Sequence, residues 1–358
     1  MTTLRFDEAA RLYGRLFYAS LTHMTSIVTI GGGTGQYALL TGLKKYPVHL
    51  TAIVTMADDG GSTGVLRDEL GVLPPGDVRQ CLVALSEADA QMRELFGYRF
   101  DRGGLRGHSF GNIFLSALER LTGSFEEAVV TASKVLAVRG DVIPVSTRGM
   151  VLTCRAGDGA LGTLRGEHVV SAAPSIDPAS LRLDPVVEAN PRALAAIAGA
   201  DAVVIGPGNF FCSVMPNLLV RGIPEAIAAT KAKVIFNCNL MTRRGHTDGY
   251  GVADFVREIE RHIGAGRIDA VTANDTPPDP ELRARYAEEG EPVLAGIGSS
   301  GLGTTHGGPG GRVFSADLVS RVIPAQKPED AVRRTLIRHD SDALAALIME
   351  RCLGVSRA

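Results

Sequence analysis

The chain has 358 residues, of which 45% are hydrophobic and 21% charged, and its formal net charge is −2. This length allows a large buried core in one or two domains. The slightly acidic balance and the absence of tryptophan argue against nucleic-acid binding, and no apolar run approaches the roughly 18 residues of a membrane-spanning helix.

Helical periodicity over residues 5–22 predicts an appended N-terminal helix within 1–24. From residue 25 to 358 we expect a single α/β domain, because apolar strands alternate with amphipathic helices. This alternation of strands and helices favours a Rossmann-like, mainly parallel sheet covered by helices. The expected strands of this sheet are 26–30, 50–56, 201–205, 233–236 and 269–273.

The helices expected around these strands are 36–45, a short one ending at Leu70, 191–198, 223–230, 252–263 and 340–353. A helical insertion over about 77–138 is predicted from the patterns at 77–86, 89–97, 109–122 and 125–138. Strands of more antiparallel character are expected at 142–146, 149–155 and 168–173. Residues 298–311 contain seven glycines without apolar periodicity, which predicts a mobile loop or a hairpin tip.

The five cysteines are dispersed and never occur at C-x-x-C spacing, so neither a zinc site nor a disulfide framework is expected. The first 24 residues lack the order of charged and apolar segments that a signal peptide has. Both observations favour a cytoplasmic protein.

The first chemistry-bearing segment is a glycine-rich loop after the strand 26–30. It reads Gly31, Gly32, Gly33, Thr34, Gly35. A glycine-rich turn between a buried strand and a helix lets backbone N–H groups approach a phosphate, and the helix dipole favours the negative charge. A tight structural turn that binds nothing is the alternative. The segment also matches the dinucleotide fingerprint formally, but no G-K-[ST] follows, which excludes a P-loop.

A second loop follows the strand 50–56. It reads Asp58, Asp59, Gly60, Gly61, Ser62, Thr63. The two carboxylates can hold Mg²⁺ beside a diphosphate or accept a proton from an attacking hydroxyl. Ser62 and Thr63 can instead simply cap the following helix. Because two acids before a double glycine exceed what a cap needs, we favour a functional role.

Further candidates stand at helix starts. Arg79 lies in a first helical turn, where it opposes the helix dipole, so it faces either an anion or solvent. Asp77 is a plausible N-cap of the same helix. The segment with His108, Ser109 and Asn112 opens an apolar helix whose free N–H groups can receive a phosphate. His108 is either a proton donor or a residue of the capping region.

The second half of the chain repeats the pattern. Gly206, Pro207, Gly208 and Asn209 follow a strand, and Ser213 and Asn217 lie just beyond. Asn239 and Thr242 follow the strand 233–236, where buried polar side chains either satisfy backbone or read a ligand. Because carboxyl ends of parallel strands share one edge, we expect these residues to face the two glycine loops across a shared site.

Taken together, these motifs resemble the CofD-like superfamily, in the branch of the gluconeogenesis factor or YvcK type. The resemblance rests on Gly31–Gly35, Asp58–Gly64, Pro74–Cys81, Gly107–Asn112, Gly206–Gly208 with Ser213, Pro216 and Asn217, Asn239–Thr242, and Arg338–Asp340. The chain departs from the branch at Asn209 and Cys212, where Ser and Thr are usual. It departs again at Arg243 and His246, where Gln and Glu are usual.

The resemblance implies a Rossmann-like fold and a nucleotide site of the UDP-sugar type. It also implies a cytoplasmic regulator that links gluconeogenic carbon metabolism to cell-envelope synthesis and cell shape. The sister branch, 2-phospho-L-lactate transferase, implies the alternative: Mg²⁺-dependent transfer of a phosphorus-containing group, with Asp58 and Asp59 as metal ligands or catalytic residues. A dehydrogenase is a third reading that names no hydride-side residue. The sequence leaves open enzyme activity, regulatory protein partners and homo-oligomer formation.

Overall fold

In the computed structural model of this chain, the described residues are 24–157, 159, 162–296, 312–322 and 336–357. The helix expected within residues 1–24 falls outside them except for Met24, and so does the glycine-rich segment 298–311. Within the described ranges, no helix is long and apolar enough to cross a membrane.

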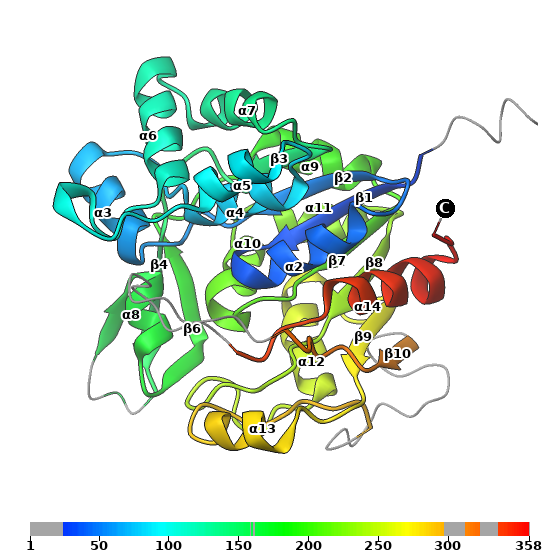
Figure 1. Ribbon diagram of the computed structural model, residues 1–358. Helices are drawn as coiled ribbons and strands as arrows, with labels where there is room; N and C mark the ends of the chain where they lie inside the picture. Colours follow the sequence, from blue (N-terminus) through cyan, green and yellow to red (C-terminus); the bar gives the residue numbers. More distant parts are fainter. Residues whose placement is uncertain (1–23, 158, 160–161, 297–311, 323–335, 358) are drawn as a thin grey trace, which may run out of the picture.

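A seven-stranded parallel sheet forms the centre of the molecule (Figure 1). In spatial order its strands are β10 (Arg312–Ala316), β9 (Ala270–Asn274), β8 (Lys233–Asn237), β7 (Ala202–Ile205), β1 (Ser26–Gly31), β2 (His49–Val54) and β3 (Asp141–Pro144). The chain moves outward from β1 to β3 and then restarts on the other side of β1 with β7. In open α/β sheets such a reversal leaves a crevice at the carboxyl ends of the strands.

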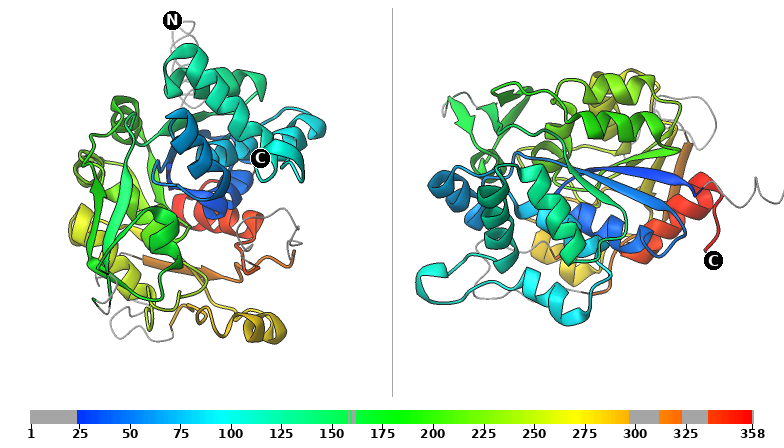
Figure 2. Two further views of the ribbon diagram at one scale, coloured as in Figure 1. Left: turned by 90° about the vertical axis from the view of Figure 1, so that its left-hand side faces the viewer. Right: turned by 90° about the horizontal axis from the view of Figure 1, so that it is seen from above.

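Helices cover both faces of this sheet (Figure 2). One face carries α2 (Gly33–Leu43), α4 (Gly76–Leu85), α7 (Phe125–Val135) and α14 (Ser341–Ala346), and the other carries α9 (Pro191–Gly199), α11 (Ile223–Ala229) and α12 (Val252–Ile263). Since both faces are covered, consecutive residues of β1 such as Ile27 and Val28 are fully buried. The expected Rossmann-like fold is confirmed.

The remaining helices lie mostly in the connections. They are α3 (Gly61–Leu70), α5 (Ala90–Gly97), a 3₁₀ turn (Gly103–Leu105), α6 (Phe110–Thr122), a π-helical segment (Phe210–Val214), α10 (Met215–Leu218), α13 (Pro280–Tyr286) and a second π-helical segment (Leu347–Leu353). The second π segment continues α14, so the helix expected over 340–353 is present with a wider last part.

A small antiparallel sheet stands apart from the main one, with strands in the order β5 (Thr163–Arg165), β4 (Val151–Ala156) and β6 (Ile176–Asp184). The antiparallel expectation holds for 149–155 but is wrong for 142–146, since β3 pairs in parallel with β2 at the edge of the main sheet. Strands β5, β6 and β10 were not predicted.

The strand expected at 168–173 is also wrong, because residues 168–172 belong to helix α8 (Glu167–Ala172). Val169 and Val170 favour a strand by propensity. The chain turns at Gly166, where φ is +103°, and the Asp59 carboxylate then accepts the N–H of His168 at 2.7 Å. This long-range cap supplies what the local sequence lacks.

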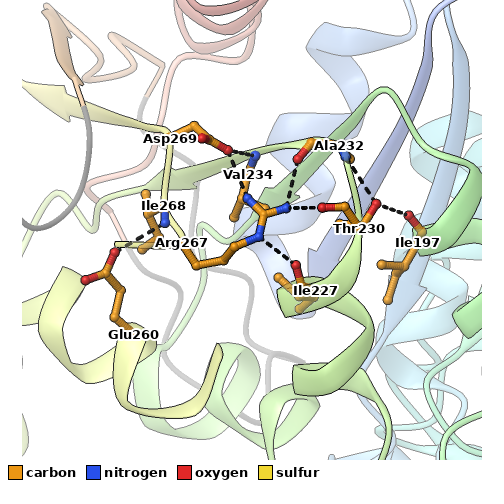
Figure 3. A network of polar contacts seen from close by, with 9 residues as sticks. All are labelled: Ile197, Ile227, Thr230, Ala232, Val234, Glu260, Arg267, Ile268 and Asp269. Carbon is orange, nitrogen blue, oxygen red and sulfur yellow. Dashed lines mark hydrogen bonds and ion pairs between the residues drawn. The ribbon is translucent and has the colours of Figure 1, made fainter. Parts of the chain in front are cut away.

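At the amino edge of the main sheet, Arg267 ties α11 to the strands β8 and β9 (Figure 3). Its guanidinium donates to the carbonyls of Ile227, Thr230 and Ala232 at 2.9, 2.7 and 2.9 Å. It also pairs with Asp269 at 3.0 Å. A cation at the carboxyl end of a helix satisfies its last carbonyls. This edge, opposite the loops that carry the candidate residues, is therefore built for stability.

Candidate functional site

The first glycine loop joins β1 to α2 under tight steric limits. A Cβ built on Gly32 would lie 2.4 Å from Oδ2 of Asp77, and one built on Gly35 would lie 2.4 Å from the carbonyl oxygen of Pro207. Gly33 has a φ of +63°, the left-handed region, and its nearest neighbour would be the Ser213 hydroxyl at 3.8 Å. Glycine is thus required for close approach at two positions and for backbone conformation at the third.

Gln36 fixes the start of α2 against the sheet. Its side chain is fully buried, and its Nε2 donates to Oγ1 of Thr29 at 3.2 Å and to the carbonyl of Ile53 at 3.1 Å. Its Oε1 accepts from Cys81 of α4 at 3.5 Å. These bonds hold β1, β2, α2 and α4 in one arrangement, so the loop is rigidly placed.

The two adjacent acids of the second loop point to different partners. Asp58 lies in the wall of the crevice, where its Oδ1 accepts the N–H of Gly60 at 3.0 Å. Asp59 instead caps α8 through His168 and pairs with Arg67 at 3.7 Å. Of the two adjacent carboxylates, Asp58 therefore lies in the cavity wall and Asp59 does not.

The second carboxylate beside Asp58 is Asp77 of α4. It is not the expected N-cap, because α4 begins at Gly76 with Pro75 in the cap position. A Cβ built on Gly76 would meet Oδ2 of Asp58 at 2.4 Å, which shows how closely α4 approaches that carboxylate. Burial and the charge of Asp58 raise the pKa of Asp77 to about 8, while the N–H of Gly33 opposes the shift.

Arg79 is held by a chain of side-chain hydrogen bonds. Its Nε donates to Oδ1 of Asn112 at 2.9 Å, Asn112 donates to Oγ of Ser62 at 3.3 Å, and Nδ1 of His108 lies 3.1 Å from the same Oγ. Burial lowers the pKa of Arg79 to about 10. Arg79 is thus partly buried and held by Asn112, and its role toward an anion stays a prediction. Ser109 caps α6 by accepting the N–H of Asn112 at 3.2 Å.

The loops after β7 and β8 complete the crevice. Asn239 donates to the carbonyl of Gly208 at 2.8 Å, which links the two loops. Asn209 donates to Oγ of Ser171 in α8 at 3.2 Å. Asn217 is fully buried and donates to the carbonyls of Gly31 and Ser213 at 3.2 and 2.8 Å, so it links the first loop to the loop after β7.

These loops enclose one cavity of about 890 Å³. The predicted residues that line it are Gly32, Gly33, Thr34, Gly35, Asp58, Gly60, Gly61, Ser62, Thr63, Arg79, Asn112, Pro207, Gly208, Asn209, Ser213, Asn239 and Thr242. The predicted residues outside its wall are Gly31, Asp59, His108, Ser109, Gly206 and Asn217. The expected convergence of both halves of the chain on one edge is thus present in the geometry.

Helix α8 of the small sheet covers one side of this cavity. Asp59 holds its amino end, while Nε2 of His246 donates to the carbonyl of Ala173 just past its carboxyl end at 3.0 Å. Arg243 donates to the carbonyl of Ser171. The helix brings Glu167 into the cavity wall, where burial and the charges of the other acids raise its pKa to about 8.

The sequence analysis did not identify several of the residues that line the cavity. Asp77 was assigned a capping role, although it stands in the 74–81 motif and that position could have marked it. Glu167 lies in the segment misread as a strand, and no local signal would have found it. Arg99 and Tyr286 come from distant parts of the chain that only the fold brings together, whereas His339 stands in the Arg338–Asp340 motif, and that position could have marked it.

A family model described as 2-phospho-L-lactate transferase CofD matches residues 27–296 of the chain. The chain belongs to the CofD family. A putative gluconeogenesis factor from a Nostoc species is 47% identical over 269 residues, which covers 74% of this CofD-family chain and 58% of that relative. The chain therefore spans little more than half of that relative's length.

The gluconeogenesis factor of Bacillus subtilis is 42% identical over 332 residues, covering 90% of this chain and 97% of that protein. A crystal structure of a protein from Bacillus halodurans superposes with a TM-score of 0.81 at 40% identity and covers 92% of this chain and all of that one. These CofD-family relatives confirm the resemblance to the gluconeogenesis factor branch.

Proposed function

We propose that the protein is a nucleotide-sugar-binding regulator that links gluconeogenic carbon metabolism to cell-envelope synthesis and cell shape. One observation carries the binding part of this proposal: three helices begin at the cavity without a side-chain cap. The cap positions are Gly32 before α2, Gly60 before α3 and Pro75 before α4. The N–H of Gly33 already donates to Asp77, but the other first-turn N–H groups of these helices can donate to phosphate oxygens, and the helix dipoles favour the negative charge.

The cavity also fits a nucleotide sugar in size and chemistry. Its volume of about 890 Å³ lies within the usual range of roughly 300–1,000 Å³ for small-molecule sites. Arg79 supplies a fixed cation in the wall. Asp58 and Asp77 supply carboxylate oxygens of the kind Mg²⁺ takes beside a diphosphate. Within the described ranges no three metal-ligating side chains converge, so Mg²⁺ would take its remaining ligands from phosphate and water.

The regulatory part of the proposal draws on the relatives that are named gluconeogenesis factor. The transferase remains the second candidate, because the matching family model carries that description. One observation favours it: Asp58, Asp77 and Glu167 stand in one cavity wall with raised pKa values, which is how acid–base groups are set up.

A thermal-shift panel tests the binding proposal. Its probes are UDP-glucose, UDP-N-acetylglucosamine, GDP, NADP and a deazaflavin, each with and without Mg²⁺. We expect a UDP-sugar to raise the melting temperature most. Gly33→Val should abolish that rise, because a branched side chain would stand where the phosphate approaches.

Gly123→Val is the matched control for this variant. Gly123 also has a left-handed φ, +74°, and a Cβ built there meets nothing within 4 Å. Both variants should lose similar stability from backbone strain, and only Gly33→Val should lose ligand stabilisation. Retained affinity in a folded Gly33→Val protein would show that the loop is purely structural.

A turnover assay separates the two candidates. For a regulator, incubation with a diphosphate-linked donor and Mg²⁺ should release no nucleoside monophosphate. Mg²⁺-dependent release that disappears in an Asp58→Asn, Asp77→Asn double variant would establish the transferase instead.

A further inference from the structure

Five buried side-chain polar atoms lack a hydrogen-bond partner among the described residues. They are Oγ of Ser116, Oδ1 of Asn217, Oδ1 of Asn239, Nδ1 of His246 and Nε2 of His339. A polar atom that is buried and unpaired is costly, so each one calls for an explanation. The last three belong to residues that line the cavity, whereas Ser116 and Asn217 do not.

All three cavity atoms are hydrogen-bond acceptors, which follows from what the rest of each side chain bonds. Asn239 directs its amide nitrogen at the carbonyl of Gly208, so its free atom is the oxygen. His246 must donate from Nε2 to the carbonyl of Ala173, which leaves Nδ1 with a lone pair. His339 hydrogen-bonds the backbone of Cys238, and with Nε2 unpaired the donor is Nδ1.

Both imidazoles are neutral at physiological pH, which keeps these lone pairs free. Burial lowers the pKa of His246, and it lowers the pKa of His339 to about 4. The three acceptors also belong together in the fold: Asn239 and His246 stand on the segment 238–247 after β8, and His339 is bonded to Cys238 at its start. Three neutral acceptors in residues that line the cavity do not suit an anion.

We propose that this wall, formed by Asn239, His246 and His339, is a glycosyl subsite that accepts hydrogen bonds from the sugar hydroxyl groups of a bound nucleotide sugar. The inference rests on the proposed function and assigns the sugar end of that ligand. The phosphates then lie at the helix starts near Gly33 and Gly60.

The chemistry of the acceptors selects hydroxyl groups over the other parts of such a ligand. A phosphate brings only acceptors and negative charge, which three lone pairs repel. A uracil edge carries two carbonyl oxygens that need donors and offers a single N–H. Hexose hydroxyl groups can each donate one hydrogen bond. The atoms are shielded in the free protein, and side-chain adjustments of this kind are common when a ligand enters.

Calorimetric titrations with UDP and with UDP-glucose test the assignment. The variants are His339→Leu, His246→Leu and His339→Gln, the last of which keeps one acceptor and one donor. Ser116→Ala is the control, since it removes an unpaired buried oxygen outside the cavity. Circular dichroism checks that each variant is folded. If one of the two leucine variants does not fold, the other alone tests the assignment.

We expect each leucine variant to weaken UDP-glucose binding about 5- to 10-fold while UDP affinity changes less than about twofold. His339→Gln should recover part of the loss, and Ser116→Ala should bind like the wild type. Equal losses for UDP and UDP-glucose, or no loss for either, would overturn the subsite while leaving the nucleotide site standing. If the wild type binds neither ligand, the proposed function fails and the subsite fails with it.

Discussion

Asp77 should make the ligand-free protein less stable, and its replacement by Asn should reveal by how much. Burial and the neighbouring Asp58 raise the pKa of Asp77 from 3.8 to about 8 in the folded state. A raised carboxyl pKa means that the folded state holds the proton more tightly than the unfolded state does. The contribution of this proton to the free energy of unfolding is fully present below pH 3.8 and is lost as the pH rises from 3.8 to about 8.

The size of the effect follows from the same two values. Each pH unit above 3.8 costs about 1.4 kcal/mol, so the loss is on the order of 2 kcal/mol at pH 5 and on the order of 4 kcal/mol at pH 7. For 358 residues the unfolding entropy is about 0.75 kcal/mol/K. Asp77→Asn keeps an oxygen for the N–H of Gly33 and removes the charge. It should therefore raise the melting temperature by about 2 °C at pH 5 and about 5–6 °C at pH 7.

Thermal melts followed by far-ultraviolet circular dichroism at both pH values, with EDTA and no nucleotide, provide the measurement. Asp101→Asn is the control, because Asp101 is 60% exposed and outside the cavity wall. A gain for Asp77→Asn that is no larger at pH 7 than at pH 5 would refute the reasoning. The same variant should bind a UDP-sugar with Mg²⁺ less tightly, since stability and function compete at this carboxylate.

Three further perturbations test single contacts. Asp59→Ala should cost about 1 kcal/mol by removing the cap on His168, and hydrogen exchange should rise in α8 more than elsewhere. Gly35→Ala should cost about 2 kcal/mol or more, seen in the urea midpoint, because the carbonyl oxygen of Pro207 lies 2.4 Å from the new Cβ. Arg79→Met should weaken UDP binding about tenfold or more in calorimetry, whereas a solvated arginine would leave it unchanged.

The parallel core could be predicted from the sequence because its signals are local. The strands around Ile27, Ile53 and Val203 are short apolar runs that end in glycine or polar residues, as strands buried on both faces do. The glycine loops were predictable for the same reason. Gly35 and Pro207 then prove to touch, as expected from the shared edge of parallel strands.

What the sequence could not reveal depends on contacts between distant residues. Residues 167–172 form a helix rather than a strand because Asp59, more than a hundred residues earlier in the chain, caps them. Asp58 and Asp59 have separate roles because Asp59 caps α8, while Asp58 lies in the cavity wall. The pKa of Asp77 is raised first by burial and then by the charge of Asp58, which α4 approaches closely because Gly76 has no Cβ.

The departures from the branch pattern at Arg243 and His246 have a physical reading in this fold. Both residues donate to carbonyl oxygens at the carboxyl end of α8, while the Asp59 carboxylate accepts at its amino end. A cation at one end and an anion at the other match the helix dipole. A Glu in place of His246 would carry no donor for that carbonyl, so a chain with Glu there must hold α8 differently. In this chain Arg243 and His246 therefore hold the carboxyl end of α8, the helix that brings Glu167 into the cavity wall.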